Sequence, residues 1–503
     1  MKKVCGGSFD NSILVPRMVR AILGTVVVIL GLFGTVMMAY LPYAAADVWH
    51  VPRDYPTIQA AINAAGSADE IVLDVGIYYE GINFLGKAIT VRGTDPNDAG
   101  VVAATVIDGN QRDSAVVFSS GEGKDSVLSG VTVQKVNAEL SYGGVYCSGS
   151  SPTISKCIIS ENQGGGIDCS DSSATIINCT IIENGDGIGC WRSSLIITEC
   201  VINKNLRSGI YCGEKSSLTL TNCSISENLS TGLSFVDSTA MVSDCTISGN
   251  NNASGANGGG ICCLSDSSPT IANCLITGNS SGAGGGIVCD WGCSPKISGC
   301  TITENSASMA GGGILCSGNA SPIVVNCIIA RNLVSDGSGG GIYCDGAGFV
   351  FPYPPFLGIP KPLIMNCTIT ENSASRFGGG ICSFFSLPTI TNCILWGDLP
   401  HEVTGKVKSI TYSHIQTGYS GVGNIRKDPL FIAASDEDYH LQSDSPCINA
   451  GTLRGAPSED KDGHLRDKRP DMGAYEYNLP PGTPFRGYRH RGLCSSRVLP
   501  SIW

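Results

Sequence analysis

A short motif recurs along this 503-residue chain and limits the folds open to it. Its copies include GGGIDCSDSSATIINCTIIEN (164–184), GGGICCLSDSSPTIANCLITGN (258–279) and GGGILCSGNASPIVVNCIIARN (311–332). Aligned on their second cysteine, the copies fall at Cys157, Cys179, Cys200, Cys223, Cys245, Cys274, Cys300, Cys327, Cys367 and Cys393. The first four steps are 22, 21, 23 and 22 residues and later ones run from 26 to 40, with the extra residues mostly between the end of one copy and the glycines of the next. A period this short is typical of a repeat architecture.

The spacing of the apolar residues predicts short strands joined by bends. Ile167 and Cys169 are two residues apart, as are Cys179 and Ile181, so each pair faces one side of a strand. Ile176 and Cys179 are three apart, which interrupts that period and marks a bend. One copy cannot bury its own apolar face, but copies stacked about 4.8 Å apart share a core. The repeat therefore predicts a β-solenoid with about 22 residues per rung.

Asparagine and glycine stand where the bends are expected. Asn closes nine copies, at Asn162, Asn184, Asn205, Asn228, Asn250, Asn279, Asn305, Asn332 and Asn372. A second Asn precedes the aligned cysteine at Asn178, Asn222, Asn273, Asn326, Asn366 and Asn392. Because Asn tolerates a left-handed backbone and its amide can bond to the Asn stacked above it, we expect an asparagine ladder at a bend.

These motifs resemble the right-handed parallel β-helix family, the architecture of pectate lyases, polygalacturonases and many exported bacterial repeat proteins, over about residues 47–478. The resemblance implies an all-β right-handed parallel β-helix (solenoid). It also implies a short N-terminal helix, from Thr57 to Ala65, that caps the first rung, because an open rung exposes sheet edges and core. Segment 428–477 resembles the tail of large exported bacterial β-helix proteins and implies an irregular C-terminal cap.

The two ends of the chain differ from its body. Arg17 and Arg20 precede an apolar run (21–41) and three alanines that end at Ala46, which predicts a secretory signal peptide. The alternative is an uncleaved membrane anchor, because 21 apolar residues can span a bilayer. Either reading places the protein outside the cell or on its surface. The expected parts are the signal or anchor (1–46), cap and irregular rungs (47–142), regular repeats (143–398), C-terminal rungs and cap (399–478) and a basic, disordered tail (479–503).

Cysteine is abundant, with 24 residues. Sister copies place Ile, Phe or Ser at the same positions, as Phe235 does, and this interchange is typical of core packing positions where a thiol behaves as a small hydrophobe. Stacked cysteines come within disulfide range, but in-register side chains do not take the required torsion. We therefore expect buried, reduced thiols. A few disulfides, involving Cys289 and Cys293, are the alternative.

The net charge of the chain restricts the kinds of partner that it can bind. The net charge is −11 and the body of the chain has no basic cluster, which argues against nucleic acid. The expected partner is a polysaccharide or another cell-surface component. The membrane would be contacted only through the N-terminal segment, if that segment is not cleaved.

Acidic residues offer the first set of candidate site residues. The outward positions of the first strand of each copy read Tyr146, Asp168, Gly189, Tyr211, Ser234, Cys262, Val288, Leu315 and Tyr343. Just past that strand we expect a row of carboxylates. Together with Asp168, the candidate catalytic residues are Asp171, Glu214, Asp237, Asp266, Asp290 and Asp345. Paired carboxylates can act as acid and base on sugars, and Ca²⁺ binds oxygen ligands of this kind. A solvated turn is the other interpretation.

Several absences weigh against catalysis. All six histidines lie outside residues 143–398, and the basic residues inside the repeat are scattered. Polygalacturonase-like signatures are missing, so the resemblance carries the fold and no catalytic residues. Residues 459–467 include Asp460, Asp462 and Gly463, as in part of a calcium loop, but lack the distal Glu and are interpreted as a polar turn. Neither a cofactor nor a dedicated metal site is expected.

Aromatic residues form the second set. Those expected to bind a ligand are Trp191, Tyr211, Trp291, Tyr343 and, in the insertion 348–360, Phe349, Phe351, Tyr353 and Phe356. The leading hypothesis is a non-catalytic exported protein that binds polysaccharide along its solenoid face. The alternatives are a polysaccharide lyase, glycoside hydrolase or epimerase that uses the acidic row, and a structural surface spacer.

Overall fold

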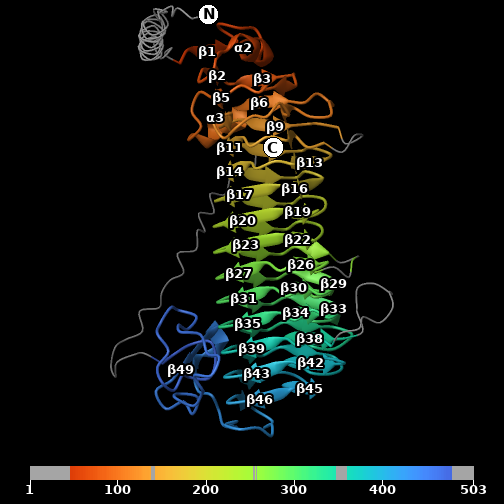
Figure 1. The fold of residues 1–503 in the computed structure, drawn as a ribbon, viewed down its shortest axis with the longest axis vertical. Coiled ribbons are helices and arrows are strands. Elements are labelled where there is room, and N and C mark those ends of the chain that lie inside the picture. Colours follow the sequence, from red (N-terminus) through yellow and green to blue (C-terminus); the bar gives the residue numbers. More distant parts are fainter. Residues whose placement is uncertain (1–45, 138–141, 253–254, 256–257, 347–358, 478–503) are drawn as a thin grey trace, which may run out of the picture. The chain divides into compact units, whose positions relative to one another are not determined.

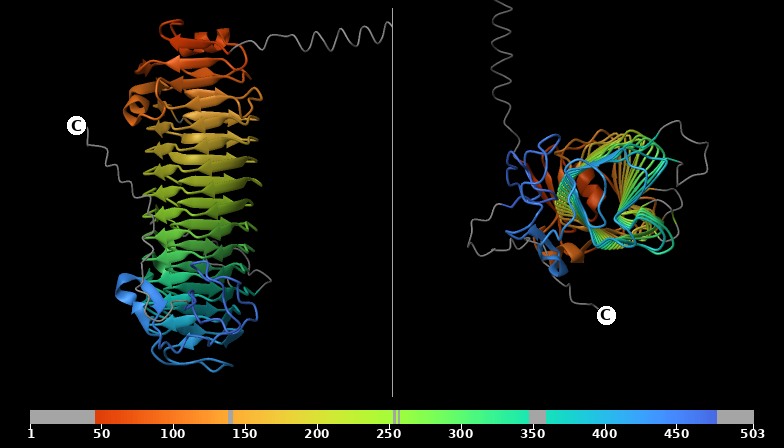
Figure 2. Two further views of the ribbon diagram at one scale, coloured as in Figure 1. Left: turned by 90° about the vertical axis from the view of Figure 1, so that its left-hand side faces the viewer. Right: turned by 90° about the horizontal axis from the view of Figure 1, so that it is seen from below.

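The computed structural model describes residues 46–137, 142–252, 255, 258–346 and 359–477, and the following concerns the unit that begins at Val48. This unit is a right-handed parallel β-solenoid (Figure 1), which confirms the all-β fold. Each rung adds one strand to each of three parallel sheets, and the rungs superimpose when viewed along the axis (Figure 2). We name these sheets 1, 2 and 3 in the order in which the chain visits them within a motif copy.

Sheet 1 holds the Gly-Ile-x-Cys strands. Its strands are β4 (Ile82–Asn83), β7 (Val116–Phe118), β10 (Val145–Ser148), β13 (Gly165–Ser170), β16 (Asp186–Trp191), β19 (Ile210–Gly213), β22 (Leu233–Val236), β26 (Ile261–Leu264), β30 (Ile287–Cys289), β34 (Ile314–Cys316), β38 (Ile342–Asp345), β42 (Ile381–Phe384) and β45 (Val403–Gly405).

Sheet 2 holds the strands that precede the aligned cysteine. They are β1 (Val48–Val51), β2 (Glu70–Leu73), β5 (Thr90–Gly93), β8 (Val127–Ser129), β11 (Thr153–Ser155), β14 (Thr175–Ile177), β17 (Ser194–Thr198), β20 (Ser217–Thr221), β23 (Thr239–Ser243), β27 (Thr270–Ala272), β31 (Lys296–Ser298), β35 (Ile323–Val325), β39 (Leu363–Met365), β43 (Thr389–Thr391) and β46 (Ser409–Thr411).

Sheet 3 holds the strands that follow it. They are β3 (Gly76–Tyr78), β6 (Thr105–Asp108), β9 (Thr132–Gln134), β12 (Ile158–Ser160), β15 (Thr180–Ile182), β18 (Val201–Asn203), β21 (Ser224–Ser226), β24 (Thr246–Ser248), β28 (Leu275–Thr277), β32 (Thr301–Thr303), β36 (Ile328–Ala330), β40 (Thr368–Thr370), β44 (Ile394–Trp396) and β47 (His414–Ile415).

A fourth sheet explains the longer repeats. Its five short strands are β25 (Asn251–Asn252), β29 (Ser280–Ala283), β33 (Ser306–Ala310), β37 (Leu333–Val334) and β41 (Ser373–Ala374). Each lies between the closing Asn of one copy and the glycines of the next, where the extra residues were located in the sequence. The lengthened rungs therefore have four strands in place of three.

The expected asparagine ladder is present, and the two rows of asparagines have different roles. The closing row is buried, and each amide bonds along the stack: Asn205 Nδ2 donates to Asn228 Oδ1 at 2.8 Å, and Asn228 Nδ2 to Asn250 Oδ1 at 2.8 Å. The ladder ends at Asp398, whose Oδ1 accepts from Asn372. The second row supplies the bend, since Asn178 has φ 54°.

Every cysteine that the structure describes is buried and free, as expected, and Cys289 and Cys293 are among them. Most of the aligned cysteines bond to the backbone of their own bend. The Cys179 thiol, for example, donates to Ile177 O at 3.4 Å and accepts from the amide of Cys157 at 3.5 Å. The thiols thus pack the core and also satisfy backbone groups that the bends expose.

The N-terminal cap is α2 (Ile58–Ala64), which confirms the helix expected there. The Thr57 side chain accepts from the Ala60 amide, and the Glu80 carboxylate accepts from the Ile58 amide at 2.9 Å, so the first helical turn is satisfied. Ile58 and Ile62 are buried. A second short helix, α3 (Ala99–Ala104), was not anticipated.

The C-terminal segment (428–477) is irregular apart from η1 (Ala434–Asp436) and the antiparallel pair β48 (Phe431–Ala433) and β49 (Asp438–Leu441). It lies beside the last rungs, against the bend between sheets 2 and 3 (Figure 1). Three asparagines of the second row bind its backbone: Asn326 donates to Glu459 O at 2.7 Å, Asn366 to Asp471 O at 3.3 Å and Asn392 to Thr452 O at 2.8 Å.

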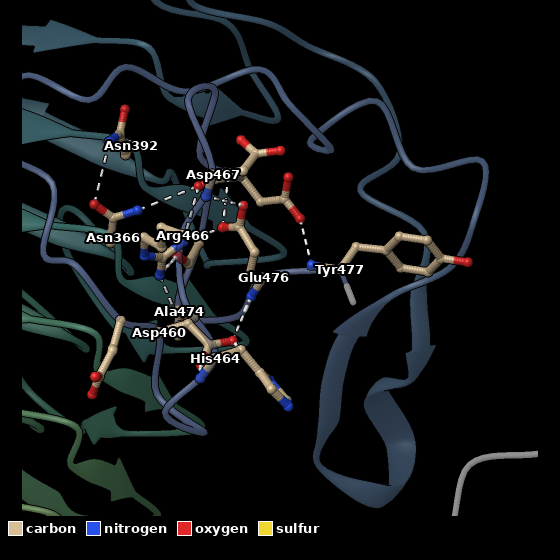
Figure 3. Close-up of polar contacts among 12 residues, drawn as sticks. Asn366, Asn392, Asp460, His464, Arg466, Asp467, Ala474, Glu476 and Tyr477 are labelled. Carbon is tan, nitrogen blue, oxygen red and sulfur yellow. Dashed lines mark hydrogen bonds and ion pairs between the residues drawn. The ribbon is translucent and has the colours of Figure 1, made fainter. Parts of the chain in front are cut away.

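A buried ion pair organises this segment (Figure 3). Arg466 Nη1 donates to Glu476 Oε2 at 2.9 Å, and both side chains are almost fully buried. Arg466 Nη2 also reaches Asn326 Oδ1 at 3.0 Å. Asp460, at the centre of the predicted polar turn, accepts from the amides of His464 and Glu476 at 2.8 and 2.7 Å. The turn is therefore built around a buried carboxylate.

None of the helices in the described part of the chain has the length and hydrophobicity of a transmembrane span. The expected signal or anchor lies in residues 1–45 and the basic tail in 478–503, outside the described residues.

Candidate functional site

The outer face of sheet 1 is open only along its earlier strands. From β26 onward, the side chains that the sequence placed outward (Cys262, Val288, Leu315 and Tyr343) form a second apolar cluster with Ala283 and Ala310 of the fourth sheet. The expectation of an exposed Tyr343 was wrong, because the glycine-rich bends fold over this face: a Cβ at Gly339 would stand 2.6 Å from Tyr343 Cβ. From β10 to β22, in contrast, no residue of sheet 1 belongs to this second cluster.

On that stretch the register aligns Tyr146, Asp168, Gly189 and Tyr211 on four successive rungs. Asp168 is 5% exposed, and the two tyrosines are half-buried. We call the surface formed by Tyr142, Tyr146, Asp168, Trp191 and Tyr211 the Asp168 face.

Aromatic rings lie on both sides of the carboxyl group. The rings of Tyr142 and Tyr146 are 4.4 Å apart between centroids, and those of Trp191 and Tyr211 are 6.0 Å apart. Three of these rings are half-buried, so they present a flat apolar surface whose edges reach water. The sequence predicted Trp191 and Tyr211 as ligand-binding residues, and the structure places them side by side.

Three glycines on consecutive rungs make the space that Asp168 and Trp191 occupy. A Cβ at Gly165 would stand 2.6 Å from both carboxylate oxygens of Asp168, and one at Gly143 would stand 2.9 Å from Oδ2. A Cβ at Gly189 would stand 2.5 Å from Asp168 Oδ1 and 2.2 Å from the Trp191 ring. Any side chain at these positions would displace the carboxyl group or the indole.

The carboxyl group of Asp168 is poised to titrate near neutrality. Its pKa is raised to about 7, chiefly by burial and in addition by the nearby Asp186 carboxylate, while the charge of Arg207 opposes the shift. Among the described residues Asp168 makes no hydrogen bond or ion pair, whereas Asp186 is paired with Arg207 at 3.0 Å. A ligand hydroxyl is the kind of group that this carboxyl lacks.

The predicted acidic row is interrupted by a cation that the sequence analysis missed. Arg192 lies between Asp171 and Glu214 and pairs with both, its Nε meeting Asp171 Oδ1 at 2.9 Å. The guanidinium lowers the pKa of Asp171. Arg192 stands two residues after Cys190, as Asp171 does after Cys169, so the spacing could have revealed it. Asp171 and Glu214 are thus held as an ion-pair network.

The other candidate acids do not continue one row. Asp237 and Asp266 are exposed at the bend, but Asp290 is fully buried, and its Oδ1 accepts from the Trp291 amide at 2.8 Å. The placement of Asp290 in the row was wrong, because it directly follows Cys289 and the bend position is taken by Trp291. Asp345 ends β38, beside Phe384.

Trp291 and Asp266 line a shallow hollow of about 290 Å³ at the same bend, four rungs from Trp191. Asp266 lies over Gly292, where a Cβ would stand 2.4 Å from Oδ1. The remaining predicted aromatics, Phe349, Phe351, Tyr353 and Phe356, lie outside the described residues. Within the described part of the chain, no group of three or more His, Cys, Asp and Glu side chains is arranged to hold a metal ion.

A family model described as a right handed beta helix region matches residues 114–256 and 208–384, which together make up more than half of the chain. The chain belongs to this family. A comparison with curated protein sequences finds no match.

Several solved structures align with this chain at low sequence identity. A pectate lyase aligns at 14% identity over 84% of this chain and 91% of that one, with a TM-score of 0.29. The A-module of a mannuronan C-5 epimerase from Azotobacter vinelandii aligns at 15% identity over 66% and 94%, with a TM-score of 0.42. A surface adhesin of Streptococcus pneumoniae aligns at 13% identity over 74% and 93%, with a TM-score of 0.42. At these identities and TM-scores, no role is carried over from these proteins to this chain.

Proposed function

We propose that this exported β-helix protein binds polysaccharide along the Asp168 face without cleaving it. One observation carries the proposal: two pairs of aromatic rings flank a buried carboxyl group on the open stretch of sheet 1. Sugar rings present apolar C–H faces and hydroxyl edges, which suits aromatic side chains beside a polar group. The hollow at Trp291 extends the same bend and gives a second place for a sugar ring.

Binding of soluble glycans by the full-length protein, measured by calorimetry, tests the proposal. Trp191→Ala should weaken binding at least tenfold, because a central aromatic contact contributes about 2 kcal/mol or more. Phe385→Ala is the matched control, since Phe385 is 80% exposed at the equivalent bend of a later rung. Absence of binding to any glycan would refute the proposal and favour a structural surface spacer.

Catalysis is the second candidate, favoured by the raised pKa of Asp168. A carboxyl group near pKa 7 beside an indole is suited to proton transfer, so a lyase, hydrolase or epimerase could use it as the acid or base. Unsaturated or reducing-end products that disappear in Asp168→Asn would establish this alternative. Adding Ca²⁺ to the same assay tests whether the exposed carboxylates recruit that ion.

A further inference from the structure

The charges on the Asp168 face point to the class of polysaccharide, an inference that rests on the proposed binding function. The carboxyl groups outnumber the cationic groups. On and around the face, along β13 to β22 and the bends at the ends of these strands, the acids are Asp168, Asp171, Asp186, Glu214 and Asp237, and the cations are Arg192, Arg207 and Lys215. Two of the cations, Arg192 and Arg207, are already in ion pairs with carboxylates.

This arrangement of charges would weaken the binding of an acidic polysaccharide. Its carboxylates would compete with Asp171, Glu214 and Asp186 for guanidinium groups that those residues already hold, and the surplus negative charge would repel it. The centre of the face is the least favourable place for a ligand carboxylate, because the Asp168 carboxyl is 5% exposed and has no cationic partner among the described residues. A second carboxylate placed there would be poorly solvated.

A hydroxyl group has no such conflict at Asp168. It can donate to the carboxylate, or accept from the carboxylic acid when the group is protonated. With its pKa raised to about 7 by burial, Asp168 is present in both forms near neutral pH. The glycines at 143, 165 and 189 keep the carboxyl group in place without covering it with a side chain of their own.

We propose that the Asp168 face selects an uncharged polysaccharide, whose hydroxyl groups bond to Asp168 while its sugar rings lie against Trp191 and Tyr211. The binding surface of this chain thus excludes polyuronates by charge and accepts neutral chains by stacking and hydrogen bonding.

The test compares glycans of similar length on the full-length protein: neutral β-glucan, mannan and xylan against polygalacturonate and alginate, at low and at physiological salt. At least one neutral glycan should bind at least tenfold more tightly than either polyuronate. Any residual polyuronate binding should strengthen as salt rises, because screening relieves repulsion.

Two variants separate the class of ligand from binding itself. Asp168→Asn keeps the shape and removes the charge, so it should reduce the difference in affinity between the neutral glycans and the polyuronates. Trp191→Ala should weaken neutral-glycan binding at least tenfold. Polyuronate binding that equals or exceeds neutral binding, and is lost in Trp191→Ala, would overturn this inference and leave glycan binding intact. Absence of binding to any of the five glycans would overturn both.

Discussion

The indole of Trp191 lies over Gly189, two residues before it on β16, so closely that a Cβ at Gly189 would stand 2.2 Å from ring atom Cη2. The same Cβ would stand 2.5 Å from Asp168 Oδ1. One hydrogen atom in place of a methyl group therefore allows a carboxyl and an indole to lie side by side on neighbouring rungs.

Gly189→Ala should consequently disrupt the Asp168 face while leaving the solenoid folded. The half-buried indole can swing outward, so we expect at least tenfold weaker glycan binding with unchanged secondary structure by circular dichroism. Gly123→Ala is the control, because nothing lies within 4 Å of a Cβ there. Binding within threefold of the wild type would contradict the assigned role of Gly189.

Asp398→Asn should stabilise the last rungs at neutral and higher pH. Asp398 Oδ2 is buried with no hydrogen-bond partner, and burial raises the pKa of this carboxyl well above 3.8. Because the folded pKa is raised, stability from the neutral form is complete below about pH 3.8 and falls as pH rises. In the ladder above it, Asn372 Nδ2 donates to Ile329 O, so an amide at 398 would restore a donor.

We expect about 1–3 kcal/mol from that substitution, the cost of a buried unsatisfied polar group. Hydrogen exchange of peptides spanning 367–402, compared with the wild type at each pH from 4 to 8, measures it. Asp444→Asn, on the surface, should change nothing. If hydrogen-exchange protection at pH 8 is the same in Asp398→Asn as in the wild type, the buried carboxyl group does not destabilise the last rungs.

Arg466→Met should release the C-terminal segment from the side of the solenoid. Removing one partner of a buried ion pair costs about 3–5 kcal/mol, because it leaves Glu476 charged and unpaired. Limited proteolysis should then cleave within 428–477 much faster. The matched control is Arg376→Met, whose pair with Asp336 is exposed and contributes about 0–1 kcal/mol. Equal cleavage rates in the two variants would argue against the docking role.

The same segment should loosen in alkali through His440. Burial disfavours its charge, yet hydrogen bonds to Asp438 at 2.6 Å and Asp462 at 2.9 Å raise the pKa of His440 to about 9. This raised pKa contributes stability fully below about pH 6.5, and that stability is lost as pH rises through 9. NMR titration of the ring should give an apparent pKa near 9. His440→Gln should weaken the pH dependence of proteolysis between pH 6.5 and 9. A His440 ring that titrates near 6.5 would refute the stabilising role of its hydrogen bonds to Asp438 and Asp462.

The buried thiols should resist reagents in the native protein. Because each of the 22 described cysteines is buried and free, an alkylating reagent should leave peptides from Cys147 to Cys447 unmodified until the chain is denatured. Peptide mapping by mass spectrometry checks this, with the denatured protein as the control. Rapid native labelling at Cys179 or Cys289 would contradict the packing described above.

The repeat pattern by itself determined the rung. Two-residue spacing decides which side chains of a strand face inward, and the three-residue step to Cys179 places the bend, so core cysteines and the Asn205–Asn228 ladder follow from the chain. Both features depend on local residue spacing and on the stacking of identical residues in successive rungs, so both can be predicted from the sequence alone.

The tertiary structure decided what covers each outward side chain. Tyr343 and Asp168 occupy equivalent outward positions and both are buried, but by different neighbours. The fourth sheet and its glycine bends cover Tyr343, whereas Asp168 lies among glycines 143, 165 and 189 and beside the indole of Trp191. Likewise, the pairing of Arg192 with two rungs and the docking of Arg466 on Asn326 join residues that no repeat spacing relates. A periodic sequence specifies which side chains of a rung face the core and which face outward. The exposure and the electrostatic partners of the outward side chains depend on the residues that neighbouring rungs and insertions place around them.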